Sequence, residues 1–128
     1  MSLLLTRLAL VGFLLIPGLA CSARRPAGAE RVDRNVITQA QIREGGFRTA
    51  YEAVESLKAP WLQIRPDGLS QQREVLVYLD NSRLGGIQSL KQVQSAQIVL
   101  IRYYDSQTAI MRWGVDHSQG VIMVVTRD

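Results

Sequence analysis

The pattern of hydrophobic and polar positions divides the chain into a helical first half and a strand-rich second half. Thr38 followed by Gln41 has the capping-box spacing that starts a helix. Gly45-Gly46 is expected to interrupt or bend that first short helix, because glycine is a poor helix former. Order is therefore expected to begin at Ile37-Thr38 with a helix.

An apolar stripe predicts a second helix of about three turns. Its members recur at helical spacing, and they are Phe47, Ala50, Tyr51, Val54 and Leu57. Pro60 is expected to stop this helix, because the residue before a proline is pushed out of the helical region. The apolar residues from Trp61 to Ile64 then predict a short extended segment, and Pro66-Asp67-Gly68 predicts a turn.

Three later segments predict β-strands, because they are apolar on successive residues and rich in β-branched side chains. They span Val75–Leu79, Ile98–Tyr104 and Val121–Thr126. Asp80-Asn81 is expected to close the first strand with a turn, and Gly85-Gly86 to allow the chain to reverse.

Short helices are expected between the strands. One covers Ile87 to Val93 with Leu90 turned inward, and another covers Ser106 to Trp113 and ends at Gly114. Strands separated by short helices predict an α+β fold, a small mixed β-sheet with short packed helices. We expect this domain to span residues 37–128.

The N-terminal residues have the three parts of an export signal. Arg7 supplies positive charge, Leu8 to Ile16 form an unbroken apolar run, and Pro17-Gly18-Leu19-Ala20 ends it with small or helix-breaking residues. The run is too short for a membrane-spanning helix, which needs ~20 residues, but it fits the roughly 7–15 residues of a signal peptide. We therefore predict a signal peptide at residues 1–20 and an exported protein.

Cys21 is the only cysteine, so it cannot form an internal disulfide. Leu19-Ala20-Cys21 resembles a bacterial lipobox, although Pro17-Gly18 departs from the usual pattern. The resemblance implies that Cys21 is the lipidation site, that it carries acyl chains such as palmitate, and that the anchor holds the protein on a membrane. Ordinary cleavage near Ala20 or Ala23 is the alternative.

The segment from Ser22 to Val36 has almost no large apolar residue and is interpreted as a flexible linker. Ser22 after the cysteine resembles the outer-membrane sorting pattern, which implies the periplasmic face of the outer membrane or the periplasm. Without Arg7 the chain keeps 14 of its 15 basic side chains against 11 acidic ones, a net charge of +3. The charges alternate in sign without a basic block, so we expect no nucleic-acid partner.

The sequence contains no positive sign of an enzyme or of a metal site. His117 is the only histidine, no nucleophile-elbow signature surrounds a serine, and Asp116 to Gly120 is interpreted as a polar turn. One histidine and one cysteine leave no zinc-ligand spacing, and Gly85-Gly86 lacks the ending of a phosphate loop. We predict no catalytic residue, no metal and no cofactor.

An ordered series of motifs resembles the plug domain of TonB-dependent outer-membrane receptors. It comprises Val75-Leu-Val-Tyr-Leu-Asp80, Leu84-Gly-Gly-Ile87, Ile98-Val-Leu-Ile-Arg-Tyr-Tyr104, Ala109, Trp113-Gly114 and Gly120-Val-Ile-Met-Val-Val-Thr-Arg127. The resemblance covers residues 72–128, or 38–128 with the preceding helix. Asn81 stands where the family has glycine, and Tyr103-Tyr104-Asp105 replaces the family's usual Glu-Val…Gly run.

The resemblance implies a plug fold without the barrel that normally encloses it. The mature length of 108 residues, 128 less 20, is too short for the roughly 22-stranded barrel of such receptors. The implied function is a non-enzymatic binding or docking module, whose partner is an envelope protein or a small ligand. Its candidate contact residues are Asp80, Asn81, Arg83, Gly85, Gly86, Tyr104, Asp105 and Trp113.

An alternative function is also consistent with the sequence. It is a structural or envelope-assembly lipoprotein that pairs with a partner strand through a sheet edge. Most aromatic residues are expected to be core or half-buried anchors, and only Tyr104 and Trp113 are retained as exposed contacts.

Overall fold

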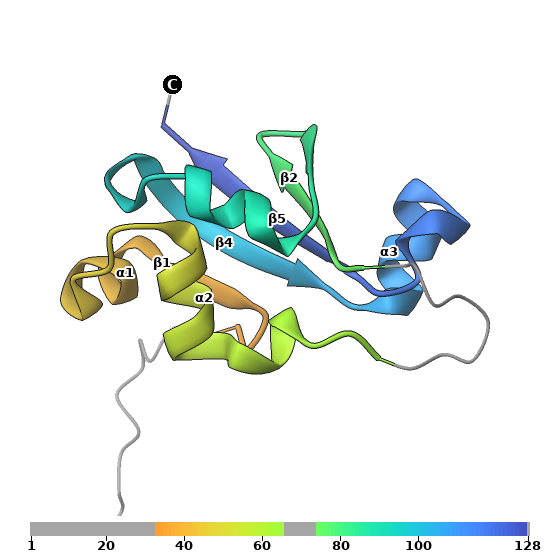
Figure 1. The fold of residues 1–128 in the computed structure, drawn as a ribbon. Coiled ribbons are helices and arrows are strands. Elements are labelled where there is room, and N and C mark those ends of the chain that lie inside the picture. The colour runs from red at the N-terminus through yellow and green to blue at the C-terminus, as the bar shows by residue number, and fades with distance from the viewer. Residues whose placement is uncertain (1–32, 66–73, 128) are drawn as a thin grey trace, which may run out of the picture. The chain divides into compact units, whose positions relative to one another are not determined.

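A mixed five-stranded β-sheet organises the residues that the computed structural model describes, 33–65 and 74–127 (Figure 1). The strands are β1 (Val36–Thr38), β2 (Leu76–Leu79), β3 (Ser82–Gly85), β4 (Ile98–Tyr104) and β5 (Val121–Thr126). Their order is β1-β4-β5-β2-β3; β2 and β5 are parallel, and the other neighbouring pairs are antiparallel. The predicted α+β class is confirmed.

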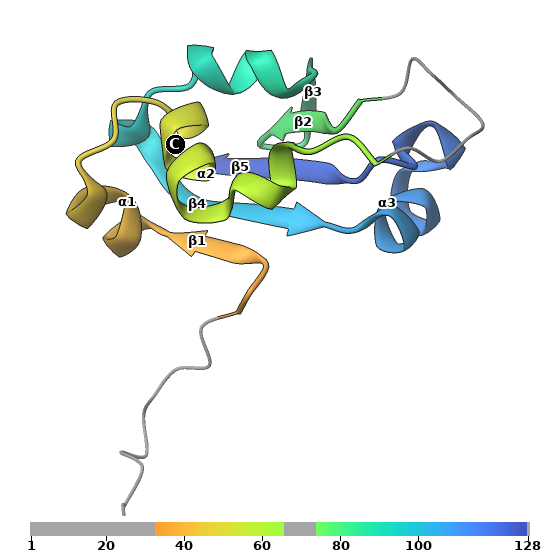
Figure 2. The same ribbon diagram turned by 60° about the horizontal axis from the view of Figure 1, so that its bottom comes forward.

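The helices cover one face of the sheet more completely than the other (Figures 1 and 2). The described helical elements are α1 (Gln39–Gly45), α2 (Ala50–Lys58), α3 (Ser106–Trp113) and the 3-10 turns η1 (Ala59–Leu62), η2 (Ile87–Gln92), η3 (Ser95–Gln97) and η4 (Val115–His117). Figure 2 shows α2 and η2 over one face, with α3 at the far end of β4. We call the face under α2 and η2 the first face and the opposite one the second face. The predicted bounds of β4, α3 and β5 are confirmed.

Each face of the sheet has its own hydrophobic cluster. Ile101 and Val124 turn toward the first face, where they pack with Val54 of α2 and Leu90 of η2. The second face carries Leu76, Tyr78, Val121 and Met123, on which α3 packs through Ala109. Successive strand residues point to opposite faces, which is why strands that are apolar throughout fill both clusters.

The first helix begins and ends as its sequence predicts. The Thr38 side chain accepts a hydrogen bond from the Gln41 backbone N–H, and the Gln41 side chain accepts one from the Thr38 N–H. This capping box satisfies two of the donors that a helix start leaves unpaired. Gly46 ends the helix in the left-handed conformation, with φ of 64°, where a residue with a Cβ is disfavoured.

The second helix differs from the predicted stripe. The Thr49 side chain accepts from the Glu52 N–H and starts α2 at Ala50, so Phe47 precedes the helix. Ala53 is fully buried, whereas Leu57 is 38% exposed. The predicted stripe was wrong at its first residue because the cap, and not the apolar spacing, sets where the helix begins. Its last residue, Leu57, lies in the helix but is partly exposed.

The extended segment predicted at Trp61 to Ile64 is also wrong in its first half. Pro60 stands at the start of the 3-10 turn η1, a position that its fixed φ suits. The turn buries Trp61, whose ring stacks on that of Tyr103 at 5.4 Å between centroids. The proline therefore ends the α-helix, as predicted, but the residues that follow form a 3-10 turn and not an extended segment.

The sequence pattern did not predict the two short edge strands, β1 and β3. The chain reverses at Asp80-Asn81, where both residues have positive φ (46° and 77°) and form a two-residue hairpin turn. Gly85-Gly86 is not that reversal, because Gly85 lies in β3 opposite Val77. Val36, which was assigned to the linker, is buried in β1.

Several predictions fall outside the described residues. They are the signal peptide, Cys21, most of the linker and the turn at residues 66–68. Within 33–65 and 74–127, none of the helices has the length and apolar character needed to cross a membrane.

Candidate functional site

The predicted contact residues lie at opposite ends of the sheet. Asp80 bonds to Thr126 at the end of β5, whereas Tyr104 pairs with Val121 at the start of β5. The hairpin turn and the loop after β4 are therefore separated by the length of a strand. The structure therefore does not bring the Asp80-Asn81 turn and the loop after β4 into one site.

Asp80 is used to hold the sheet together. One carboxylate oxygen accepts from the Thr126 backbone N–H at 2.8 Å, and the other accepts from the Thr126 hydroxyl. These contacts give Asp80 a structural role that needs no ligand. Gly86 lies beside the Glu74 carboxylate, the end of an exposed side chain.

Asp105 also has a structural role, as the N-cap of α3. Its carboxylate accepts from the Thr108 backbone N–H at 2.8 Å. Hydrogen bonding from the Thr108 backbone and side chain lowers the pKa of Asp105, because it favours the charged form.

The stability contributed by this cap should depend on pH. Because the folded-state pKa of Asp105 is lowered, its contribution is present above the ordinary aspartate pKa of about 3.9 and is lost as the pH falls through the folded pKa. Asp105→Asn keeps the capping oxygen and removes the charge. The difference in melting temperature between the two proteins should therefore shrink as the pH is lowered from about 6 to about 2. A constant difference across that range would contradict the assignment.

Three of the other predicted residues, Arg83, Tyr104 and Trp113, share the second face of the sheet, whereas Asn81 lies in the hairpin turn and Gly85 lies opposite Val77 of the first face. The register places one row of partners across it, in the order Val36, Arg102, Met123, Tyr78 and Arg83. Tyr104 lies two residues after Arg102 on the same strand. From α3, Trp113 stacks on Tyr78, and Arg112 lies over the rings of Trp113 and Tyr104. We call the following set the Arg–aromatic surface: Tyr78, Arg83, Arg102, Tyr104, Arg112 and Trp113.

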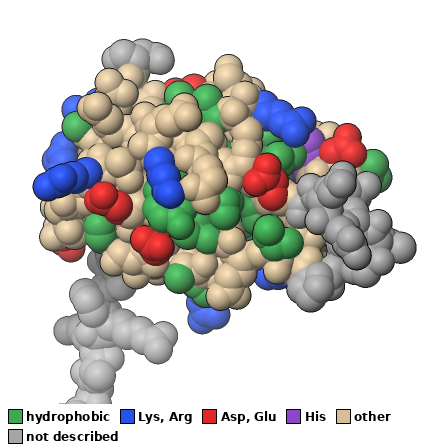
Figure 3. Space-filling view, in the orientation of Figure 1, with side chains coloured by type: hydrophobic (Ala, Val, Ile, Leu, Met, Phe, Trp, Pro, Cys, Tyr) green, Lys and Arg blue, Asp and Glu red, His purple; other side chains and the backbone are tan. Residues whose placement is uncertain are grey.

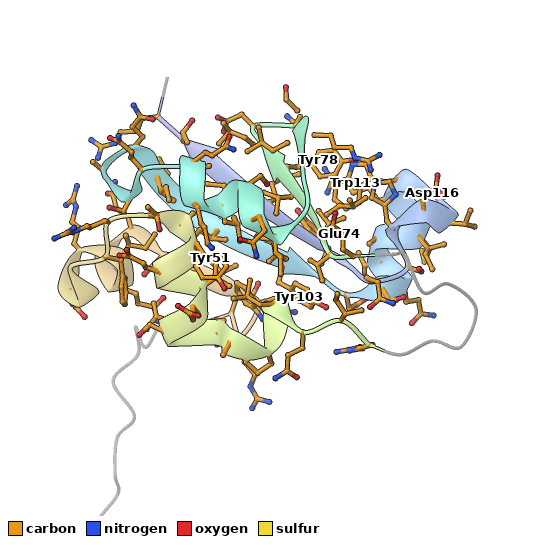
Figure 4. All side chains as sticks on the ribbon, viewed as in Figure 1. Tyr51, Glu74, Tyr78, Tyr103, Trp113 and Asp116 are labelled. Atoms are coloured by element: carbon orange, nitrogen blue, oxygen red, sulfur yellow. The ribbon has the colours of Figure 1, made fainter. Side chains whose placement is uncertain are left out.

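Trp113 joins the aromatic part of this surface. Its ring stacks on Tyr78 at 5.4 Å and meets the edge of Tyr104 at 5.1 Å. Figure 4 shows Tyr78 and Trp113 close together between β2 and α3. Such pairs add attraction beyond the area they bury, so they fix the position of the half-buried rings.

Arg112 is held on these rings while it stays exposed. Its guanidinium carbon lies 4.8 Å from the Trp113 ring centre and 5.3 Å from that of Tyr104, and its Nη1 donates to the Tyr104 hydroxyl at 3.4 Å. Cation–π contacts of this kind orient a guanidinium without neutralising it. Arg112 is thus a preorganised cation on the second face.

His117 lies behind the surface and is 6% exposed. Its Nε2 is 2.8 Å from the Tyr78 hydroxyl, and its Nδ1 is 3.3 Å from the Gly114 carbonyl. The turn predicted at Asp116 to Gly120 is present in part as η4 and the residues after it, but the histidine points inward. Sequence reasoning missed this because the partner, Tyr78, is 39 residues away.

The hydrogen bond between Tyr78 and His117 should be measurable. Tyr78→Phe leaves the buried Nε2 of His117 without its partner, which should lower the free energy of unfolding by about 1–3 kcal/mol. Tyr104→Phe removes a hydroxyl at the surface and should change it by less than about 0.5 kcal/mol. Chemical denaturation of both variants compares them, and equal losses would argue against a role for the buried pair.

A shallow hollow adjoins the Arg–aromatic surface at the end of β4. It measures about 150 Å³ and is lined by Asp33, Asn35, Arg102, Tyr103, Tyr104, Asp105 and Thr108. A second hollow, of about 230 Å³, lies between α1 and the residues just before β4. Small-molecule sites usually enclose ~300–1,000 Å³, so these hollows suit part of a larger partner better than a whole ligand.

The first face carries charges of both signs. Figure 3, which views the first face, shows basic and acidic side chains interspersed over the helices. Among the described residues, no three histidine, cysteine, aspartate or glutamate side chains are grouped so as to hold a metal ion. The Arg–aromatic surface is therefore the candidate site that the geometry favours.

Comparison with known proteins gives no further guide. The chain matches no protein-family model, no curated protein and no solved structure.

Proposed function

We propose that the protein is a non-enzymatic docking module that binds an envelope protein through the Arg–aromatic surface. The observation that carries this proposal is the exposed Arg112 guanidinium, held against the rings of Trp113 and Tyr104. Tryptophan, tyrosine and arginine are the residues that most often dominate the energy of a protein interface. Here Trp113 and Tyr104 are half-buried, and their contacts with the exposed Arg112 hold all three side chains in place, which reduces the entropy lost on binding.

The other arginines extend the same surface. Arg83 lies opposite Tyr78, and Arg102 lies opposite Met123, so both side chains emerge on the second face beside the rings. Cations around an apolar centre favour a partner with acidic groups at the matching positions. The partner is accordingly a protein that presents carboxylates around an apolar contact.

The cellular setting of the proposal comes from the sequence. The export signal and Cys21 support a lipid-anchored protein on the periplasmic face of the outer membrane. The resemblance of residues 72–128 to a receptor plug supports a binding role in that envelope.

The geometry does not favour pairing through a sheet edge. On β1 the two outward N–H groups are occupied, Val36 N–H by the Asp33 carbonyl and Thr38 N–H by the Gln41 side chain. On β3 the ladder is broken by the register shift around Leu84, and Arg83 adds a charge. Short, bulged and charged edges resist strand addition.

Site-specific photo-crosslinking tests the proposed docking. A benzophenone amino acid replaces Arg83 on the Arg–aromatic surface, and in the control it replaces Glu55, which is exposed on α2. In intact cells that express the full chain, we expect a discrete protein adduct from position 83 and none from position 55. Adducts of equal yield from both positions, or none from either, would refute the proposal.

A further inference from the structure

Arg112 is held on the Arg–aromatic surface by only part of its guanidinium group. A guanidinium carries several N–H donors in one plane. One donor, on Nη1, bonds to the Tyr104 hydroxyl at 3.4 Å, and the central carbon lies over the rings of Trp113 and Tyr104. Within residues 33–65 and 74–127, no acceptor is bonded to Nε or Nη2 of Arg112. The edge that these two nitrogens form is therefore available to a ligand.

The nearby acidic side chains do not occupy this edge. The Asp105 carboxylate accepts from the Thr108 N–H as the cap of α3. Asp116 comes after Gly114, where the helix ends, and in the described part of the chain it forms no ion pair with Arg112. A charged pair of hydrogen bonds acts at contact distance, so it depends on the geometry of the two groups more than on the summed charge around them.

Arg112 differs in its contacts from the other two arginines of the surface. Arg83 and Arg102 are exposed, and among the described residues neither guanidinium lies over an aromatic ring. The plane of the Arg112 guanidinium is set by two rings and one hydrogen bond before a partner arrives. Less side-chain entropy is therefore lost when a partner binds to Arg112 than when it binds to an arginine without such contacts.

We propose that the Nε–Nη2 edge of Arg112 receives one carboxylate of the partner protein in a two-pronged contact. Two parallel N–H donors match the two oxygens of a carboxylate, and such pairs are stronger than hydrogen bonds between neutral groups. The carboxylate belongs to an aspartate or glutamate side chain of the partner or to its C-terminus. This inference rests on the proposed docking function, and it adds the group of the partner that Arg112 recognises.

The contact requires arginine and not merely a positive charge. A lysine at position 112 would keep the charge, but an ammonium has neither the planar fork of donors nor a flat face to lie over the two rings. At Arg102, which has no ring contact, lysine should serve nearly as well. Arg102→Lys is therefore the matched control for Arg112→Lys.

The yield of the photo-crosslinked adduct at position 83 tests the contact. Full chains with the benzophenone amino acid at that position also carry Arg112→Lys, Arg112→Gln or Arg102→Lys, and they are expressed in intact cells at a level far from saturation. We expect both Arg112 variants to lower the yield about tenfold. Arg102→Lys should change it by less than about twofold. Chemical denaturation of the purified chains checks that each variant is folded.

The outcomes separate this inference from the proposed function. If Arg112→Lys keeps the adduct while Arg112→Gln loses it, charge alone is sufficient and the two-pronged contact is refuted. Retention by both Arg112 variants, or an equal loss with Arg102→Lys, also overturns the inference, although docking itself stands. Absence of any adduct from the parent chain refutes the proposed function, and the inference falls with it.

Changes in the partner distinguish the two sources of the carboxylate. Mass spectrometry of the adduct identifies the partner and its crosslinked peptide. Aspartate and glutamate residues near that peptide are changed to asparagine and glutamine, and in a separate arm the C-terminus of the partner is extended by glycines. One of the two arms should reproduce the loss seen with Arg112→Lys. If neither arm lowers the yield, no carboxylate is bound and the inference is overturned.

Discussion

Replacing Gly120 with alanine should lower the free energy of unfolding by roughly 3 kcal/mol or more. Gly120 has φ of 97°, in the region that side chains disfavour. A Cβ at this position would lie 2.8 Å from the Tyr104 carbonyl oxygen and 2.9 Å from the Tyr103 hydroxyl. The carbonyl belongs to the backbone at the end of β4, so it cannot move aside without disturbing the sheet.

Gly114→Ala is the matched control for this prediction. Gly114 has a similar φ of 101°, but a Cβ there meets nothing within 4 Å. It should therefore show only the conformational strain, on the order of 1–2 kcal/mol. Chemical denaturation of the two variants separates backbone strain from steric overlap. Equal losses of unfolding free energy would mean that the overlap of a Cβ at position 120 with the Tyr104 carbonyl does not destabilise the protein.

Trp113→Ala should have the second largest effect, a loss of about 2–4 kcal/mol in stability together with loss of the crosslinked adduct at position 83. Trp113 contacts Tyr78, Tyr104 and Arg112 at once. Its removal opens a space under α3 and frees the Arg112 guanidinium. Stability is read from denaturation, and docking from the adduct yield in cells.

Loss of folding could by itself abolish docking, so a milder pair of variants distinguishes the two effects. Trp113→Phe and Trp61→Phe each shrink one stacked indole, on the second and the first face respectively. Both should be moderately destabilised, but only Trp113→Phe should reduce the adduct. If Trp61→Phe reduces it as much, the adduct reports stability and the surface assignment fails.

Much of the fold follows from local sequence. The strands at Ile98–Tyr104 and Val121–Thr126 were predicted with their observed bounds. Both are long, mostly apolar runs inside the sheet; β5 is buried on both faces, whereas β4 is buried mainly on the first. The α3 helix was equally well defined, because Asp105 caps its start and Gly114 follows its end.

The edges of the sheet were not predictable in the same way. β1 and β3 contain only three and four residues, and β3 is largely exposed. Strands of three or four residues are too short to show a hydrophobic pattern of their own, and their pairing depends on a neighbour in the sheet. The hairpin at Asp80-Asn81 was predicted as a turn, but not as the start of another strand.

The residues of the candidate site were likewise only partly predictable from local sequence. Sequence alone picked out Arg83, Tyr104 and Trp113, but together with Asp80 and Asp105, whose carboxylates proved to hold backbone structure. The sequence pattern did not identify Arg102 and Arg112, because an isolated arginine in a strand or helix is not part of any recognisable binding motif. The alternation of Leu76 with Tyr78, and the spacing of Ala109 and Trp113, were the available hints that these side chains share a face.

The sequence by itself determined that the protein is α+β, where its central strands and its last helix lie, and which residues were available for contact. Only the tertiary structure decided that Arg102, Tyr78 and Arg83 form one row, because strand register is set by packing between distant segments. The same packing turned His117 inward to Tyr78 and Met111 outward to solvent. Local patterns specify elements; which of their side chains meet depends on how the whole sheet pairs.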